Sequence, residues 1–297
     1  MLSVSICVCA YNEESIIEHA IRSVFSQRTD GFEITEVIVV SSESTDGTDG
    51  IVKRLMAEFP SLRLIQQEKR MGKNSAINEF LENKKEGNIS VLLNGDNVLC
   101  DELSLYHLIS PFNDEKVGMV GGHPIPTNDP KKLMGFVSHM IWTMHHHVSM
   151  MRPKLGELVA FRDVGIRILS ALQLDEDIIK MEIEKKGYVS VYAPGAVILN
   201  RGPETVDDFI RQRVRIDAGM EYLRKELGCS VSTWDKDLLL HALFASVRDL
   251  GFHPFKMSFA IMLEVISRLK AKEYVRSGKG FMTVWSRVDS TKDLKKD

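Results

Sequence analysis

Carboxylates at two places in the sequence could hold a metal ion or accept a proton. Asp96 lies in the segment 94–97, Asn-Gly-Asp-Asn, directly after the apolar run 91–93. A carboxylate at the end of a strand can bind Mg²⁺ or Mn²⁺ while phosphate groups supply the remaining oxygens. The second group is the acidic run 175–177, Asp-Glu-Asp, at the start of a helical pattern. Acidic residues are favoured at helix starts on electrostatic grounds alone, so this run fits either a catalytic or a structural role.

Cationic and amide side chains form two further groups that could bind phosphate. Arg70 and Lys73 lie where a strand pattern leads into a helix pattern. Backbone amides at such a helix start, with cationic side chains beside them, can hold a diphosphate. Gln212, Arg213 and Arg215 lie within a predicted helix. For both groups, solvated surface charge is the alternative to ligand binding.

Short polar turns close the first two predicted strands. After the first strand, Asn12 is predicted to cap a helix whose first turn contains Glu13 and Glu14. After the second, the segment 42–48 has the Ser, Thr, Asp and Gly composition of an ordinary loop. Neither turn indicates a ligand by itself.

Most of these groups fall at the junctions of an alternation of strands and helices. Apolar runs at 4–10, 36–40, 62–65 and 89–93 are separated by helical patterns. The alternation predicts a mostly parallel sheet with helices on both faces. Ligands of such sheets bind beyond the carboxyl ends of the strands. The second half is less regular, with predicted strands at 117–121, 157–161 and 188–192 and predicted helices at 131–151, 175–186 and 204–226.

The composition narrows the class of protein. The 297-residue chain is 44% hydrophobic and 27% charged, which suits one large domain or a domain with an appendage. Its formal net charge of −3 provides no overall basic field of the kind that marks a nucleic-acid binder. No apolar run approaches the ~20 residues needed to span a bilayer, and no secretory signal is visible. A cytoplasmic protein, soluble or peripherally attached to a membrane, is therefore expected.

Taken in order, these groups resemble the family 2 glycosyltransferases, whose catalytic domain has the α/β nucleotide-binding fold called GT-A. The resemblance covers roughly residues 2–222. It begins with the strand and turn 4–13 and continues through 44–48, Ser-Thr-Asp-Gly-Thr, and 70–78, Arg-x-Gly-Lys-x-x-Ala-x-Asn. The segment 94–96 takes the place of the family's metal-binding Asp-x-Asp. The pair 176–177 takes the place of its acidic pair, and 212–215 that of the Gln-x-x-Arg-Trp found in many members.

The resemblance implies an enzyme that transfers a sugar from a nucleotide-diphospho-sugar to an acceptor hydroxyl with inversion. Asp177 would be the general base, with Glu176 beside it. Asp96 would hold a divalent cation, Mg²⁺ or Mn²⁺, that neutralises the departing diphosphate. The segment 157–162 resembles the part of the family that lines the acceptor side. The residues implied for donor binding are Ala10, Tyr11, Glu13, Ser42, Arg70, Lys73, Asn94, Gln212, Arg213 and Arg215.

The sequence departs from the family pattern in three ways. Ser41 and Ser42 lie where the family usually has two acidic residues, so the sequence identifies neither the nucleotide base nor the sugar of the donor. Asn94 replaces the first Asp of the metal motif, and Ile216 replaces the usual Trp. The last change, with the absence of a predicted membrane span, argues against a processive polymer synthase. Two alternatives stay open, namely a catalytically silent GT-A protein that binds nucleotide sugars and a nucleotidyltransferase.

A helical segment, 227–297, is predicted to follow a catalytic domain of residues 1–226. Residues 252–280 carry six Lys or Arg against two Glu, and four Phe lie beside them at 252–281. Basic residues next to an aromatic, apolar helix favour peripheral contact with an anionic membrane, and with it an acceptor that is lipid-linked or a glycan. The alternative is a pair of helices packed on the catalytic domain.

Overall fold

Four parallel strands form one half of the sheet in the computed structural model, which describes residues 1–85, 87–168, 174–227, 235–277 and 291. β1 (Leu2–Ala10) pairs with β2 (Phe32–Ser42) on one side and with β4 (Ile89–Asn94) on the other. β3 (Leu62–Gln67) pairs with β2. Ile6 and Cys7, whose side chains point to opposite faces of β1, are both fully buried. The predicted parallel strands with helices on both faces are confirmed.

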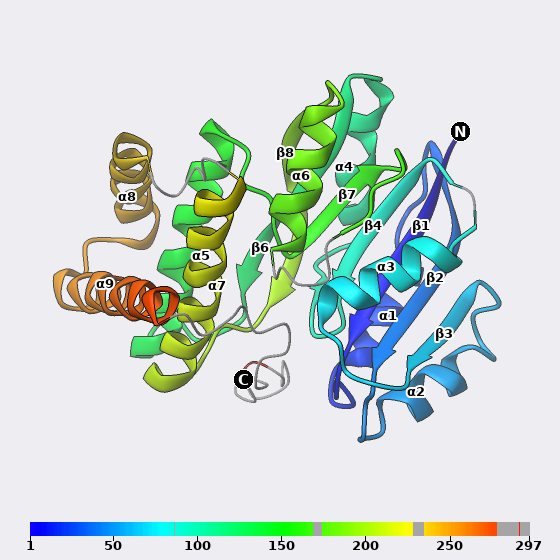
Figure 1. Cartoon of the computed structure of the whole chain (residues 1–297), viewed down its shortest axis with the longest axis horizontal. Helices are drawn as coiled ribbons and strands as arrows, with labels where there is room; N and C mark the ends of the chain where they lie inside the picture. The colour runs from blue at the N-terminus through cyan, green and yellow to red at the C-terminus, as the bar shows by residue number, and fades with distance from the viewer. Residues whose placement is uncertain (86, 169–173, 228–234, 278–290, 292–297) are drawn as a thin grey trace. The chain divides into compact units, whose positions relative to one another are not determined.

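The helices of this half divide between the two faces of the sheet. Side chains of α1 (Ile17–Phe25), α2 (Thr48–Leu55) and α4 (Ser104–Ile109) form one buried cluster with the even-numbered residues of β1. A short 3₁₀ helix, η1 (Ser110–Asn113), follows α4. On the other face α3 (Lys73–Asn83) packs against β1 and β2, as Figure 1 shows.

Three pairings among the remaining strands are antiparallel. β7 (Leu158–Arg162) pairs with β4 and with β6 (Val117–Pro126), and β5 (Val98–Leu99) pairs with β8 (Val189–Asn200). The order across the eight-stranded sheet is β3-β2-β1-β4-β7-β6-β8-β5. The sheet is therefore mixed, because β1 to β4 pair in parallel while β7 is antiparallel to both β4 and β6.

The described residues group into two compact units. The first comprises those of 1–124 and 155–199 and includes α6 (Asp175–Lys185). The second comprises those of 125–154 and 200–277, with residue 291. Its helices are α5 (Leu133–Met151), α7 (Val206–Leu227), α8 (Lys236–Leu250) and α9 (Pro254–Arg276), with a core that includes Phe136, Phe209 and Leu263. The predicted division into a catalytic domain, residues 1–226, and a helical segment, residues 227–297, stays a prediction.

The turn after β1 differs from the prediction. Asn12 has a left-handed backbone, with φ of 54°, and α1 begins only at Ile17. The side chain of Asn12 accepts a hydrogen bond from the backbone N of Thr45 at 2.7 Å. Likewise, Oε2 of Glu14 accepts one from the N of Gly47 at 2.8 Å. The prediction that Asn12 caps a helix with Glu14 in its first turn is wrong, because these side chains join the turn after β1 to the turn after β2.

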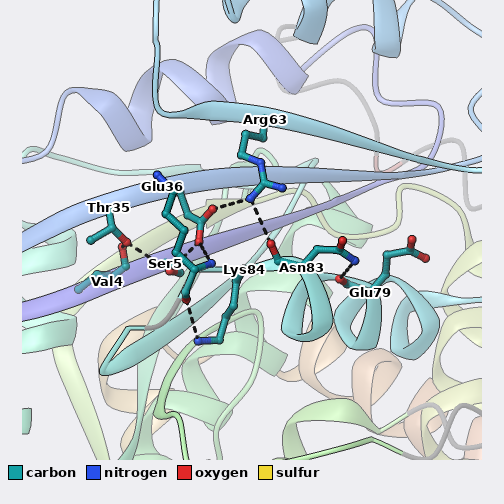
Figure 2. Close-up of polar contacts among 9 residues, drawn as sticks. Val4, Ser5, Thr35, Glu36, Arg63, Glu79, Asn83 and Lys84 are labelled. Atoms are coloured by element: carbon teal, nitrogen blue, oxygen red, sulfur yellow. Dashed lines mark hydrogen bonds and ion pairs between the residues drawn. The ribbon is translucent and has the colours of Figure 1, made fainter.

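A buried carboxylate in β2 fastens the end of α3 to the sheet, as Figure 2 shows. Glu36 accepts hydrogen bonds from Oγ of Ser5 at 3.2 Å, from the N of Lys85 at 2.5 Å and from Nη1 of Arg63 at 2.8 Å. The same Nη1 donates to the carbonyl of Asn83, the last residue of α3, at 3.1 Å. Glu36 lies six residues before the carboxyl end of β2, a distance of about 20 Å along a strand. The cluster therefore belongs to the framework of the sheet.

Candidate active site

Lys73, the first residue of α3, brings two of the predicted groups together. Its Nζ lies 2.7 Å from Oδ2 of Asp175 and 2.9 Å from Oε1 of Glu176, in the first turn of α6. Gly72 precedes it with φ of 89°, a conformation that glycine adopts without strain. The turn between β3 and α3 therefore points the ammonium group at the acidic run, 102 residues further along the chain.

Burial and charge separate the pKa values of the two carboxyl groups. Asp175 is 4% exposed, and burial together with the charge of Glu176 raises the pKa of its carboxyl to about 7. Burial acts in the same direction on Glu176, but the charge of Lys73 and its hydrogen bond outweigh burial and lower that pKa to about 2. The two carboxylates in turn raise the pKa of Lys73 well above its usual range, although burial opposes them. The cluster thus holds a charged pair, Lys73 and Glu176, next to a carboxyl that titrates near neutral pH.

The turn after β4 carries a second acidic site. Nδ2 of Asn94 and Nδ2 of Asn97 both donate to Oε2 of Glu157, at 2.8 and 2.9 Å. Burial and the charge of Asp96 raise the pKa of Glu157. A cation placed near these two carboxylates would relieve their repulsion.

Gly95 fits this turn tightly against the end of β1. A Cβ built on it would lie 3.0 Å from the carbonyl oxygen of Cys9 and 3.2 Å from the Cβ of Ala10. The backbone N of Gly95 also donates to the Cys9 carbonyl at 2.8 Å. The loop that carries Asp96 is therefore packed closely against the carboxyl end of β1.

The donor set suits Mg²⁺ or Mn²⁺ only in part. Carboxylate oxygens are appropriate ligands for both ions, and Asp96 supplies one at the end of a strand. Within the described residues, no cluster of three or more His, Cys, Asp or Glu is arranged to hold a metal ion. In many Mg²⁺ sites one or two carboxylates bind the ion and substrate phosphates complete its coordination.

The ends of β1 and β3 present a stacked pair of side chains. The guanidinium carbon of Arg70 lies 3.8 Å from the centre of the Tyr11 ring, within the range of a cation–π contact. The backbone N of Arg70 donates to Oε2 of Glu43 at 3.0 Å. At the end of β2, Oγ of Ser42 donates to Oε1 of Gln67 at 2.7 Å. These contacts line the carboxyl ends of β1, β2 and β3, and Ser42 lies there where the family usually has an acidic residue.

Other predicted residues lie on the same edge or in the second unit. Glu13 is buried after β1, and its backbone N donates to Oγ1 of Thr48 at 2.7 Å. Asp177 lies in the first turn of α6, half-buried, directly after Glu176. Arg213 belongs to α7, where Oε1 of Glu264 in α9 lies 2.7 Å from its Nε.

The roles predicted for Gln212, Arg213 and Arg215 in donor binding stay predictions. The same holds for the general base Asp177 and for the metal ligand Asp96.

Sequence reasoning missed two residues of the site. Asp175 was part of the acidic run, but nothing in the sequence indicated that it shares Lys73 with Glu176. Glu157 was predicted only as part of an acceptor-side segment, and its hydrogen bonds to Asn94 and Asn97 join it to the Asp96 turn. The asparagines on both sides of Asp96 were the one available signal.

The sheet and its covering helices form the fold called GT-A, which solved structures of several glycosyltransferases share. Mannosyltransferase PcManGT from Pyrobaculum calidifontis, in complex with GDP-Man and Mn²⁺, superimposes with a TM-score of 0.67 at 20% identity, covering 93% of this chain and 87% of that one. Staphylococcus aureus TarS 1–349 gives 0.51 at 16% identity over 95% and 93% of the two chains. Glucosyl-3-phosphoglycerate synthase of Mycobacterium tuberculosis, with Mn²⁺, UDP and phosphoglyceric acid, gives 0.51 at 19% identity over 74% and 77%.

The chain belongs to glycosyl transferase family 2, because the sequence model of that family matches residues 5–175, more than half of the chain. Poly-beta-1,6-N-acetyl-D-glucosamine synthase of Staphylococcus aureus is 24% identical over 247 residues, which cover 77% of this chain and 58% of the synthase. An uncharacterised protein of Mycobacterium tuberculosis is 33% identical over 116 residues, 39% of this chain and 34% of that protein. The chain thus spans between a third and three fifths of these relatives. The family resemblance and the GT-A fold predicted from the sequence are confirmed.

Proposed function

We propose that the chain transfers a sugar from a nucleotide-diphospho-sugar to an acceptor hydroxyl, with inversion at the anomeric carbon and with help from a divalent cation. One observation carries the proposal, namely the convergence of Lys73 with Asp175 and Glu176 at the ends of α3 and α6. These ion pairs hold the acidic run 175–177 near the carboxyl ends of the parallel strands, where α/β domains bind their ligands. The similar solved structures contain GDP-Man, UDP or UDP-GlcNAc, which supports a nucleotide sugar as donor.

Asp177 takes the acceptor proton in this proposal. As the acceptor oxygen bonds to the anomeric carbon, its proton passes to the Asp177 carboxylate and the bond from that carbon to the diphosphate oxygen breaks. Glu176, kept ionised by Lys73, stabilises positive charge that develops on the sugar. A single displacement of this kind inverts the configuration.

The donor lies along the turns after β1, β3 and β4. Asp96 would hold the divalent cation, with the Glu157 carboxyl as its electrostatic neighbour, and the cation would supply positive charge to neutralise the departing diphosphate. The Tyr11 and Arg70 pair offers a flat surface for the nucleotide base. The donor's remaining contacts are proposed for Ala10, Glu13, Ser42, Lys73, Asn94, Gln212, Arg213 and Arg215.

The acceptor is proposed to be a glycan or a lipid-linked molecule at the cytoplasmic face of a membrane. The chain matches only part of its curated relatives. The name of the poly-beta-1,6-N-acetyl-D-glucosamine synthase supports a sugar-transfer reaction, and the acceptor of this chain is a matter for experiment.

A panel of UDP-, GDP-, CDP- and dTDP-sugars tests the proposal by thermal unfolding with and without Mn²⁺. A ligand at about 100 times its Kd stabilises the folded state by about 2.7 kcal/mol, which is readily measured. We expect one nucleotide to stabilise the protein in a Mn²⁺-dependent way and its sugar to be released or transferred. Binding without turnover would instead support the silent GT-A protein, and transfer of a nucleotidyl group would support the nucleotidyltransferase.

A further inference from the structure

An unusual amount of apolar surface lies on the outer side of α8, α9 and the segment that joins them. Phe244, Phe252 and Phe255 are each about three-quarters exposed, at 74%, 73% and 75%. Large aromatic side chains are seldom left in water to this extent, and a cluster of them marks a surface for a partner. All three belong to the second unit.

The two faces of α9 have opposite environments. Its inner face, with Ala260, Leu263, Ser267 and Ala271, is buried. Glu264 adds an ion pair with Arg213 of α7 to this packing. The predicted packing of the carboxyl-terminal helices is thus present on one side of α9 only.

The outer face of α9 is an apolar stripe. Phe255, Met262, Val265 and Leu269 follow one another by seven, three and four residues, the spacing of one side of an α-helix. Met262 is 47% exposed, Val265 50% and Leu269 62%. Ile261, 45% exposed, widens the stripe on one edge.

Basic side chains surround the end of this stripe. Lys270, Lys272 and Arg276 are exposed in the last two turns of α9. Arg268, just before them, is half-buried, and its Nε lies 3.8 Å from Oε2 of Glu264. Among the described residues of α9 the only acidic side chains are Glu264, which is paired with Arg213, and the exposed Glu273. The outer face is therefore both apolar and positively charged.

We infer that the outer face of α9, with Phe252 before it, binds to an anionic lipid bilayer, with the helix lying in the plane of the membrane surface. Apolar side chains that enter the boundary between headgroups and acyl chains, flanked by lysine and arginine beside anionic headgroups, fit such a surface. A second copy of this chain fits less well, because α9 would offer it an excess of positive charge and a single exposed carboxylate. Within the described residues, no helix combines the length and the apolar composition needed to cross a bilayer. The contact is therefore reversible and peripheral.

Sedimentation of the full chain with vesicles tests this inference without any nucleotide sugar, so it can fail or succeed independently of the proposed activity. Vesicles of phosphatidylcholine and phosphatidylglycerol are compared with vesicles of phosphatidylcholine alone, each at low and high salt. We expect binding to the anionic vesicles at low salt and its loss at high salt. No binding to anionic vesicles at low salt overturns the inference.

Two pairs of variants separate the apolar and the charged contributions. Phe255→Ser with Leu269→Ser should weaken binding about ten- to a hundredfold, with Met56→Ser in the first unit as the matched control. Lys270→Glu with Lys272→Glu should weaken binding by at least about tenfold. Lys185→Glu with Lys186→Glu, which changes the net charge equally on exposed residues of the first unit, should not. Thermal unfolding confirms that each variant is folded.

Equal binding by the α9 variants and their controls would refute the inference. So would a dimer, detected by light scattering, that the Phe255→Ser and Leu269→Ser changes dissociate in a protein that ignores vesicles. That result would assign the stripe to a second copy of the chain.

Discussion

The ion pairs of Lys73 give the sharpest prediction about the site. Lys73→Met removes the ammonium group and keeps most of the volume of the side chain. It leaves Asp175 and Glu176 next to each other with no cation at 2.7 and 2.9 Å. Asp175 can respond by taking up a proton, because its pKa is already about 7. For Glu176, the folding free energy that is lost with the ammonium group can be calculated from its pKa.

The size of the loss follows from the pKa of Glu176. A fall from 4.5 to about 2 corresponds to about 3 kcal/mol of folding free energy at pH 7. The side chain is 19% exposed, so solvent screening reduces this value only moderately. Because the pKa is lowered in the folded protein, the stabilisation is present above pH 4.5 and disappears as the pH falls through 2. Lys73→Met should therefore cost about 3 kcal/mol at pH 7 and about 1 kcal/mol near pH 3.

Urea unfolding of the wild type and Lys73→Met across this pH range measures the difference. Lys180→Met is the matched control, because Lys180 pairs with Glu184 near the surface of α6, where the loss should stay below about 1 kcal/mol. A loss in Lys73→Met that is no larger than in the control, or that is the same at pH 7 and pH 3, would refute the reasoning.

Four further outcomes are expected. Asp96→Ala should abolish the Mn²⁺ dependence of donor binding in thermal unfolding, and unchanged dependence would remove Asp96 from the metal site. Asp177→Asn should retain donor affinity and lose about 10²–10⁴ in turnover, and Glu176→Gln as the slower variant would mean that the base was assigned to the wrong carboxylate. Asp175→Asn should remove a loss of stability that the wild type shows as the pH rises from about 4 to about 7, because the raised pKa makes the folded state bind the extra proton; urea unfolding at both pH values checks this. Glu36→Gln should lower the free energy of unfolding by about 1–3 kcal/mol without changing donor affinity, and an effect on affinity would link this framework cluster to the site.

Hydrophobic patterns predicted the parallel half of the fold, because strands buried on both faces need continuous apolar runs. Ile6 and Cys7 are both fully buried, as such a run requires. The same patterns carry no information on strand direction, so the antiparallel pairing of β7 with β4 and β6 could not be predicted. The left-handed backbone of Asn12 could not be predicted from the sequence either, because it is stabilised by a hydrogen bond from Thr45, 33 residues away.

The motifs predicted which residue types follow the strands, but they did not predict which residues those side chains contact. Lys73 was expected beside a diphosphate, yet its partners in the structure are Asp175 and Glu176. Ion pairs between residues so distant along the chain depend on the packing of whole helices, which short motifs do not encode. The link from Asn94 to Glu157 is of the same kind, because the two residues are 63 positions apart in the sequence.

Glu36 has a consequence for how β2 finds its place in the sheet. The stretch from Val37 to Val40 is fully buried on both faces, so its apolar side chains would fit nearly as well if the strand slipped by one residue. A slip would turn the Glu36 carboxylate toward the opposite face, into the cluster that contains Val37 and Val39, without Ser5 or Arg63 to bind it. An unpaired charge buried there would cost several kcal/mol. One carboxylate thus selects a single alignment of β2 among alignments that its apolar residues alone would not distinguish.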